Sequence, residues 1–270
     1  MIDSRQQEEL RNKYNPEGSV LRTVQLRMLE MLKFIDDICR KNGIRYWLSS
    51  GTCLGAVRHG GFIPWDDDVD IEMLGEDYDR LVKILENGDY SPFIIQTKDN
   101  DKDYFYTYGK LRDLKSEIIE NGLDAGHYKY NGCFIDIFPL ERNCSYRISY
   151  VVRGFYNKLY NKESILNGQG ETVSLYREIK RKAVKNFVIP IISRFAEINC
   201  GKRYRHRLPT SFLGPRYSDD IKEIKYVPFE DTKLPIPKKY DSYLKHLFGD
   251  YMAMPAESTI RPHIKEVRFK

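Results

Sequence analysis

The most chemically suggestive stretch of the chain is a group of four aspartates within residues 66–70. Asp68 and Asp70 alternate with Val69 and Ile71, so in a β-strand the carboxylates would share one face while the aliphatic side chains enter a core. Carboxylates placed side by side repel and raise one another's pKa unless a cation compensates them. Hard oxygen ligands select Mg²⁺ or Mn²⁺ over Zn²⁺. The pattern predicts a divalent-metal site, and the competing interpretation is an acidic surface loop before the next helix.

A glycine-led turn precedes these aspartates. An apolar run ends at Gly51-Thr52, and a short helical segment is predicted directly after it. Because the N-terminus of a helix exposes backbone N–H groups and favours anions, Gly51 and Thr52 are candidates for holding a phosphate. Phosphate on backbone amides and metal on nearby carboxylates is the arrangement that phosphoryl transfer needs.

Two later segments carry charged residues on predicted strands. Residues 104–112 alternate as a strand, which would place Lys110 and Arg112 on one face. Two cations on one face can bind an anionic donor together, whereas each cation alone is more often a solvated surface residue. Asp136 lies within an apolar strand predicted over 133–140. An ionised carboxylate there is costly to bury unless it is paired or bound to metal, and the alternative is a capped or edge-strand aspartate.

These residues need a scaffold, which the hydrophobic periodicity indicates. Apolar residues at helical spacing predict a long amphipathic helix over 16–42 that ends at Gly43 and packs behind a sheet. A first strand is predicted over 44–50. A helix over 76–86 and a short strand over 93–95 follow the aspartates.

Length and composition limit the class of protein. A chain of 270 residues, 41% apolar and 31% charged, is globular and long enough for one large domain or one and a half. No apolar run approaches the roughly 18–20 residues of a membrane span. The polar, acidic amino-terminal residues do not resemble a secretory signal. Five scattered cysteines without CxxC spacing argue against a disulfide framework or structural zinc, so we expect a cytoplasmic protein.

The net charge of +5 is unevenly distributed. Residues 145–207 contain 14 Lys or Arg and 4 Asp or Glu, whereas the remainder contains 30 basic and 35 acidic residues. We therefore divide the chain into a catalytic core (1–144), a basic helical insertion (145–210) and a C-terminal segment (211–270) that packs back on the core. The insertion is interpreted as a solvated helical cap or, alternatively, as a patch that contacts an anionic membrane from its inner face or a lipid-linked glycan. Nucleic acid is not expected, because no recognised module accompanies the charge.

Two nearly continuous strings, Gly51–His59 and Gly61–Ile71, resemble the signature of the LicD family. The segment Phe134–Pro139 and a closing segment are similar to that family as well, so the resemblance covers about residues 20–140 and 225–265. The family comprises phosphocholine transferases and relatives, including the fukutin-type ribitol-phosphate transferases, on a nucleotidyltransferase fold. The resemblance therefore implies an α+β fold with a nucleotidyltransferase-like mixed β-sheet core flanked by helices.

The resemblance also implies a metal-dependent transferase that moves a phospho-alcohol group, with CDP-choline as the favoured donor, onto a sugar hydroxyl of a cell-surface glycan or its precursor. Asp68, Asp70 and Asp136 would be the catalytic carboxylates and the ligands of one or two Mg²⁺ or Mn²⁺ ions. Asp136 would be the third acidic residue that this fold requires on a neighbouring strand. The donor would be bound by Gly51, Thr52, Arg58, His59, Lys110 and Arg112.

Three alternatives remain open at this point. The donor could carry ribitol, glycerol or ethanolamine in place of choline. The enzyme could be a true nucleotidyltransferase that adds NMP to an acceptor with pyrophosphate leaving. The chain could also be a catalytically inactive binding module on the same fold, although three carboxylates beside Gly-Thr argue against that. Metal-dependent stabilisation by a CDP-alcohol would separate the enzyme from the inactive module.

Overall fold

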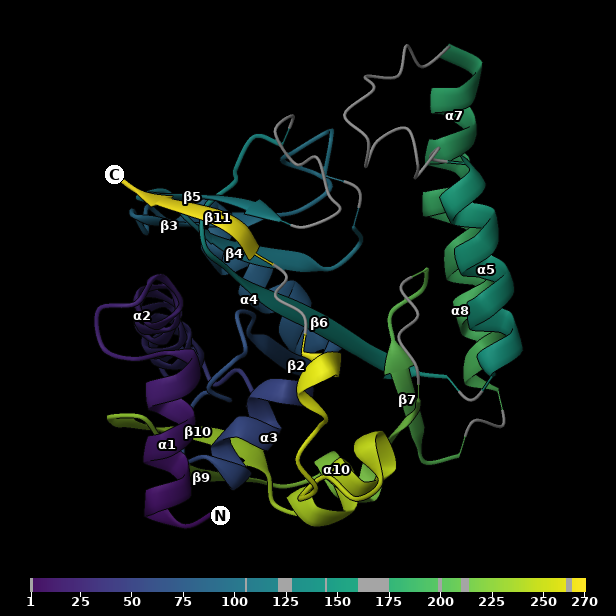
Figure 1. The fold of residues 1–270 in the computed structure, drawn as a ribbon. Helices are drawn as coiled ribbons and strands as arrows, with labels where there is room; N and C mark the ends of the chain where they lie inside the picture. Colours follow the sequence, from purple (N-terminus) through teal and green to yellow (C-terminus); the bar gives the residue numbers. More distant parts are fainter. Residues whose placement is uncertain are drawn as a thin grey trace.

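A computed structural model describes residues 2–104, 106–120, 128–143, 145–159, 175–198, 201–209, 214–260 and 264–270. One mixed β-sheet runs through the centre of the molecule, with helices packed against it (Figure 1). The predicted α+β fold, a mixed sheet flanked by helices, is confirmed.

The central sheet has the strand order β1-β2-β6-β4-β3. β2 and β6 are parallel, and the other pairs are antiparallel. β7 pairs with the carboxyl end of β6, beyond the part that β4 covers, and β8 pairs with β7. The strands of this sheet are β1 (Tyr46–Leu48), β2 (Asp70–Leu74), β3 (Phe93–Gln96), β4 (Gly109–Asp113), β6 (Phe134–Arg142), β7 (Arg203–His206) and β8 (Arg216–Tyr217).

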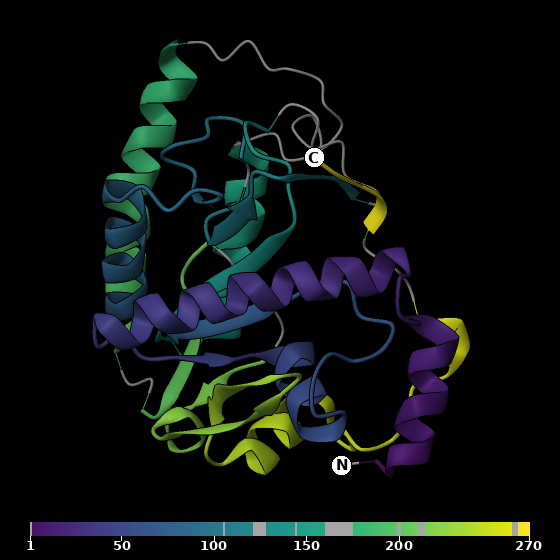
Figure 2. The same cartoon turned by 90° about the vertical axis from the view of Figure 1, so that its left-hand side faces the viewer.

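The two faces of this sheet differ in chemistry. The register pairs Ile71 with Ile137 and Leu111 with Ile135, so buried aliphatic side chains share one face. Helices α2 (Val20–Lys41) and α4 (Gly75–Asn87) cover that face, and α2 crosses in front of the sheet in Figure 2. Polar and charged side chains therefore gather on the opposite face.

The long helix α2 shows how local sequence sets an element. The predicted helix over 16–42 begins at Val20, because the Ser19 hydroxyl accepts a hydrogen bond from the Arg22 N–H and caps the first turn. Its inner stripe includes Met28, Leu32 and Ile35, all completely buried. This stripe anchors the helix on the aliphatic face of the sheet.

The C-terminal segment returns to the core. Helix α10 (Tyr240–Phe248) packs on α3 (Ser50–Arg58) and buries Tyr243 and Leu244. The first turn of α3 contains Gly51 and Thr52, which form the glycine-led turn. β11 pairs with β5 in a separate two-stranded sheet, and β9 pairs with β10 in another. The remaining elements outside the basic segment are α1 (Ser4–Tyr14), β5 (Ser116–Glu120), α9 (Ser218–Ile221), β9 (Ile224–Phe229), β10 (Thr232–Pro237), η2 (Glu257–Thr259) and β11 (Ile264–Phe269).

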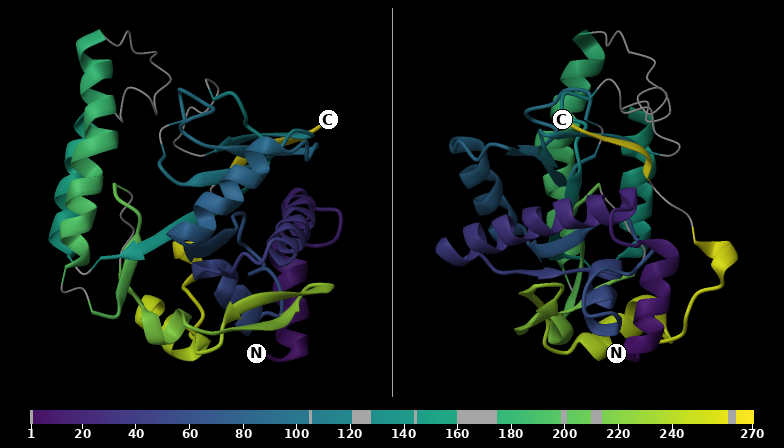
Figure 3. Two further views of the ribbon diagram at one scale, coloured as in Figure 1. Left: turned by 180° about the vertical axis from the view of Figure 1, so that it is seen from behind. Right: turned by 60° about the vertical axis from the view of Figure 1, so that its left-hand side comes forward.

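The basic segment forms a helical hairpin that stands beside the sheet in Figures 1 and 3. One arm is α5 (Tyr146–Leu159), and the other is a continuous helix made of α7 (Leu175–Ala183), the π-helical turn η1 (Val184–Val188) and α8 (Ile189–Glu197). We call these described residues the basic hairpin. No helix in the described part of the chain is both long and apolar enough to cross a membrane.

Three local predictions differ from the structure. The helical prediction for 145–207 is wrong at Arg203–His206, which form β7 because their alternation fits the open edge of β6. The strand predicted over 104–112 begins only at Gly109, since tyrosine rings pack on one another before it. Asp68 precedes β2, which begins at Asp70.

The loop between α3 and the aspartates depends on a glycine. A Cβ atom added at Gly55 would lie 2.5 Å from the backbone oxygen of Gly61, which is shorter than any ordinary contact. We predict that Gly55→Ala lowers the free energy of unfolding by about 1–3 kcal/mol, because the loop must move. Urea unfolding measures this cost.

A second helical glycine provides the control. Apart from its own helix, no atom lies within 4 Å of a Cβ added at Gly154 in α5. Gly154→Ala should therefore stabilise the protein slightly, by up to about 1 kcal/mol, through helix propensity alone. Equal effects of the two substitutions would contradict the close packing of this loop on α3.

Candidate active site

Asp70 and Asp136 lie side by side on the polar face of the sheet. Parallel pairing of β2 and β6 aligns the two residues, and the Asp136 N–H donates to the Val69 oxygen at 2.8 Å. Adjacent strands lie about 4.8 Å apart, so the two carboxyl groups project into the same space. The structure thus brings together two of the three carboxylates predicted to act as a unit.

Asp66 and Asp68 complete the acidic cluster from the loop before β2. Burial raises the pKa of Asp66 well above its usual range, and the neighbouring Asp68 and Asp70 raise it further, with a hydrogen bond between the Asp66 and Asp68 carboxyls. Burial likewise raises the pKa of Asp70, with Asp68 and Asp136 adding to the effect. These four side chains are the carboxylate cluster. Sequence reasoning did not include Asp66 among the catalytic residues.

Lys110 is the cation that faces this cluster from β4. Its ammonium lies 2.8 Å from an Asp136 oxygen, opposite which the sheet register places it, and 3.4 Å from the centre of the Phe134 ring. Lys110 opposes the rise in the pKa of Asp70 but does not cancel it. Binding of the donor by Lys110 stays a prediction.

The donor set fits a hard divalent cation. Closely packed carboxylates whose pKa values are raised by one another gain most from added positive charge, and oxygen ligands suit Mg²⁺ or Mn²⁺. Among the described residues, no three His, Cys, Asp or Glu side chains already converge as a complete ligand set. Metal binding therefore stays a prediction.

The glycine-led turn lies against the cluster. A Cβ atom at Gly51 would be 3.0 Å from an Asp66 carboxylate oxygen, so glycine permits this approach. The Thr52 hydroxyl accepts a hydrogen bond of 2.9 Å from the Asp70 N–H, which ties the start of α3 to β2. Ser50 has a positive φ of 46°, a strained conformation for a residue with a side chain, at the turn into α3. The amino end of α3 and the carboxylate cluster are thus one unit.

Arg58 and His59 form hydrogen bonds with segments near the two ends of the chain. Arg58 donates to the backbone oxygens of Tyr251 and Ala253 at 3.0 and 3.1 Å, and to His59 Nε2 at 2.9 Å. Burial, with Arg58 close by, lowers the pKa of His59 to about 3. His59 is therefore neutral at pH 7 and brings no positive charge to a phosphate. Contact of Arg58 and His59 with the donor stays a prediction.

Arg112 also makes internal hydrogen bonds. It lies on the same face as Lys110, as predicted, but its guanidinium donates to the Gln96 side chain at 2.7 Å and to the Gly132 oxygen at 2.9 Å. Its side chain is almost fully buried. Arg112 holds β4 to its neighbours in this structure, and its role toward the donor remains a prediction.

Sequence reasoning missed Glu72, which is completely buried two residues after Asp70 on the same face of β2. Burial alone would raise its pKa, but Arg216 and His206 hold the pKa below the usual value. The contacts are 2.6 Å to Arg216, 3.0 Å to His206 and 3.0 Å to the Tyr243 hydroxyl. The signal in the sequence was the alternation from Asp68 and Asp70, which continues to Glu72.

Tyr243 links this buried network to the glycine-led turn. Its hydroxyl lies 3.0 Å from the Ser49 hydroxyl and 3.0 Å from the Glu72 carboxylate. Ser49 immediately precedes the strained Ser50. The C-terminal helix α10 therefore holds both the turn and the strand that carries Asp70.

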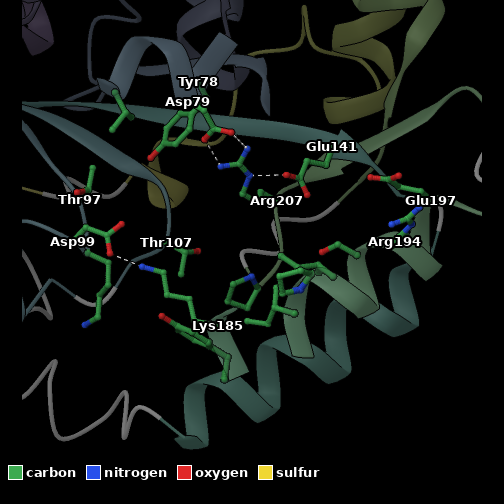
Figure 4. Close-up of a pocket in the computed structure, with 18 of the residues that line it drawn as sticks. Tyr78, Asp79, Thr97, Asp99, Thr107, Glu141, Lys185, Arg194, Glu197 and Arg207 are labelled. Carbon is green, nitrogen blue, oxygen red and sulfur yellow. Dashed lines mark hydrogen bonds and ion pairs between the residues drawn. The ribbon is translucent and has the colours of Figure 1, made fainter. Parts of the chain in front are cut away.

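A separate cavity of about 730 Å³ lies between the basic hairpin and α4 (Figure 4). Arg207 crosses it, bonding Asp79 at 2.6 Å and Glu141 at 2.6 Å, and Lys185 of η1 pairs with Asp99. The four side chains of the carboxylate cluster are not among its lining residues. The cavity marks where the hairpin meets the core, not where the predicted chemistry lies.

Residues 43–167 match the family described as LicD/FKTN/FKRP, nucleotidyltransferase domain. The resemblance to the LicD family is confirmed. Over 265 aligned residues the chain is 27% identical to the lipopolysaccharide cholinephosphotransferase LicD of Haemophilus influenzae, an alignment that covers 90% of this chain and 95% of that protein.

Shorter segments are similar to other LicD relatives. The chain is 48% identical over 136 residues to the uncharacterised protein RP689 of Rickettsia prowazekii, covering 43% of this chain and 46% of that protein. It is 46% identical over 48 residues to the human ribitol 5-phosphate transferase FKRP, covering 18% of this chain and 10% of that protein. The LicD-type segment contains every site residue predicted from the sequence, whereas His206, Arg216 and Tyr243 lie outside it.

The buried Glu72 network generates a prediction about stability. Glu72→Gln keeps the shape of the side chain but leaves the buried Arg216 charge without its anion. We expect the free energy of unfolding to fall by about 3–5 kcal/mol, measured by urea unfolding. The matched control is Glu141→Gln, since the partly exposed Arg207 keeps Asp79 and the loss should stay below about 1 kcal/mol. Similar small losses for both variants would refute the importance of the network.

The carboxylate cluster generates a prediction about pH. Because the pKa values of Asp66 and Asp70 are raised in the folded protein, the folded state keeps protons that the unfolded chain has lost. This contribution stabilises the protein as pH falls from neutrality toward the usual aspartate pKa and is lost as pH rises. In chelator, Asp70→Asn should therefore melt higher than the unmodified protein, by more at about pH 8 than at about pH 6.

His59 is present in both proteins, so its contribution cancels when the two melting temperatures are compared. Its lowered pKa would otherwise make stability fall as pH drops below the usual histidine pKa, which is opposite to the effect of the aspartates. Adding Mg²⁺ should raise the melting temperature of the unmodified protein more at the higher pH, because carboxylate ligands must be deprotonated. An Mg²⁺ shift of the same size in Asp70→Asn would show that the cation binds elsewhere.

Proposed function

We propose that this LicD-type protein is a metal-dependent transferase that moves a phospho-alcohol group from a CDP-alcohol to a sugar hydroxyl of a glycan. The observation that carries the proposal is the carboxylate cluster, with Asp70 and Asp136 aligned on adjacent strands beside the amino end of α3. Similarity to a cholinephosphotransferase over most of both chains supports the same reaction class. A nucleotidyl transfer would use the same carboxylates, so product analysis must separate the two.

The carboxylates Asp68, Asp70 and Asp136 would hold Mg²⁺ or Mn²⁺, and Asp66 joins them in this proposal because it lies against Asp68. When bound, the cation supplies positive charge to the donor's phosphate oxygens as the leaving CMP takes up negative charge. Lys110 contributes a further positive charge from β4. Backbone N–H groups of Gly51 and Thr52 lie in the first turn of α3 and would bind a phosphate of the donor.

We assign the acceptance of the sugar hydroxyl's proton to Asp136. Its carboxylate lies beside that of Asp70 and is oriented by the ion pair with Lys110 at 2.8 Å. A general base needs a carboxylate held in a fixed orientation toward the hydroxyl, and the ion pair with Lys110 provides such an anchor. Asp70, whose pKa is raised by burial and by two neighbouring carboxylates, is less suited to that role and better suited to a cation.

Tyrosines beside the cluster favour choline as the alcohol. Tyr104, Tyr106 and Tyr108 pack with rings about 5–6 Å apart, and the half-buried Tyr106 lies 5.8 Å from the Lys110 ammonium. Aromatic faces attract quaternary ammonium groups, whereas ribitol and glycerol carry no such charge. This arrangement, together with the Haemophilus relative, supports CDP-choline over the other donors.

The function is tested by removing single carboxylate charges. Asp70→Asn and Asp136→Asn should each lower the transfer rate by about three orders of magnitude or more, because charge in the transition state loses its support. Mass spectrometry of the acceptor reports a gain of phosphocholine, of another phospho-alcohol or of a nucleotide. The control Asp37→Asn removes an exposed carboxylate of α2 and should keep the rate. Near-normal turnover in both cluster variants would rule out the assignment.

Donor choice is tested at Tyr106. Tyr106→Ala should raise KM for CDP-choline by about tenfold, since the ring face is lost, and should leave KM for CDP-glycerol nearly unchanged. Tyr106→Phe retains the face and should behave like the unmodified protein. The comparison of Ala with Phe separates recognition of choline from a packing defect. A parallel loss for both donors would argue against contact between this ring and the alcohol.

A further inference from the structure

The basic hairpin exposes an unusual share of the protein's large apolar side chains. Residues 145–159 and 175–198 make up about a sixth of the described residues but hold 12 of the 21 exposed large hydrophobic side chains found there. Several are highly exposed, among them Tyr176 at 76%, Phe187 at 67% and Phe195 at 66%. Scattered exposed apolar residues are normal, but such a concentration indicates a surface that meets something other than water.

The exposed apolar residues of α5 are spread over about half of the helix circumference. Val152, Tyr156 and Leu159 face inward and are buried. Tyr150 is 56% exposed and lies roughly 150° around the helix from the mean direction of this buried set, at 3.6 residues per turn. Phe155 is 46% exposed and lies at the border between the exposed and buried sides, about one turn before Leu159. This arm of the hairpin is therefore apolar both toward the protein and away from it.

The second arm repeats this arrangement. Phe187, Ile191 and Phe195 recur at four-residue intervals and are exposed. The α8 residues Ile189 and Ser193, which line the cavity against the core, point in a direction roughly 160° away from that of Ile191 and Phe195 at 3.6 residues per turn. The ion pair of Lys185 with Asp99 fastens this arm to the core (Figure 4). The apolar stripe faces away from that attachment.

Charge indicates which partner fits. The described hairpin, residues 145–159 and 175–198, contains nine Lys or Arg and two Asp or Glu. Arg147, Lys158 and Lys180 are exposed within it. A second copy meeting this face symmetrically would bring two strongly positive surfaces together, which is unfavourable. An anionic lipid surface offers the opposite charge together with an apolar layer for the exposed rings.

We propose that the basic hairpin docks on the surface of an anionic lipid bilayer, with its exposed aromatic and aliphatic side chains in the headgroup region and its lysines and arginines at the phosphates. Such a surface binds in the plane of the membrane without crossing it. The proposal goes beyond the transfer reaction and does not depend on the catalytic assignment. Vesicle binding and turnover can therefore fail independently of each other.

The test uses flotation of the full-length protein with vesicles. The protein should float with vesicles of phosphatidylcholine mixed with phosphatidylglycerol, and not with phosphatidylcholine alone, and added salt should weaken binding. Phe187→Ser combined with Phe195→Ser should reduce binding by about tenfold or more, because the inserted rings are lost. Lys158→Glu combined with Lys180→Glu should reduce binding to the anionic vesicles by about tenfold.

Matched controls lie elsewhere on the surface. Phe248→Ser removes a comparably exposed ring on α10, and Lys83→Glu reverses an exposed charge on α4. Both should bind like the unmodified protein. A gain-of-signal variant, Phe195→Trp, should show a blue-shifted emission with anionic vesicles only, which does not depend on a loss of function.

Two results would overturn the proposal. One is binding that is equal on neutral and anionic vesicles or unaffected by the hairpin substitutions. The other is a dimer in solution that the Phe187→Ser and Phe195→Ser variant converts to a monomer, since the apolar face would then belong to a second copy. Circular dichroism and a cooperative thermal unfolding transition report whether each variant is folded.

Discussion

Repulsion among carboxylates that the sheet register forces together is the constraint on which the site depends. Asp70 and Asp136 occupy aligned positions of parallel strands, and a hydrogen bond from the Asp136 N–H to the Val69 oxygen holds that alignment. The backbone cannot relieve the repulsion without breaking the sheet. Relief must come from side-chain rotation, a shared proton, Lys110 or an added cation. A rigid anionic site of this kind is consistent with the metal-assisted phosphoryl transfer that we propose.

Glu72 shows that neighbouring acids on one strand need not share a role. It lies on the same face as Asp70, yet Arg216 and His206 compensate its charge from inside the protein. Asp70 has no comparable internal compensation, since its pKa stays raised. The difference comes from the partners that packing supplies and not from residue type. One acid therefore stabilises the fold, and the other remains responsive to a cation.

The C-terminal part of the chain completes a site whose signature lies in the first half. Tyr243 reaches Ser49 before the glycine-led turn, and Arg58 of α3 reaches the backbone at Tyr251 and Ala253. The turn contains Ser50 in a strained conformation, which must be held by its surroundings. The basic hairpin contributes differently: it meets the core at a cavity, where Lys185 pairs with Asp99, and it leaves apolar side chains exposed.

Local sequence was sufficient for much of the fold. The 3.6-residue periodicity of α2, the Gly51-Thr52 turn and the alternation around Asp70 each arise from residues close together in the chain, so their backbone conformation follows from neighbouring side chains. The long strings around Gly51 and Asp68 also made it possible to recognise the resemblance to the LicD family. The same local reasoning failed at Arg203–His206, because their strand exists only where the edge of β6 is available.

The charge state and partners of the site came from long-range packing. Glu72 meets Arg216 across 144 residues and Tyr243 across 171, separations that no periodicity encodes. His59 looked like a cation for phosphate, but burial beside Arg58 makes it neutral. Neighbouring residues in the sequence dictate backbone geometry through sterics and hydrogen bonding. Which charges lie together, and which are removed from water, is set when distant segments pack.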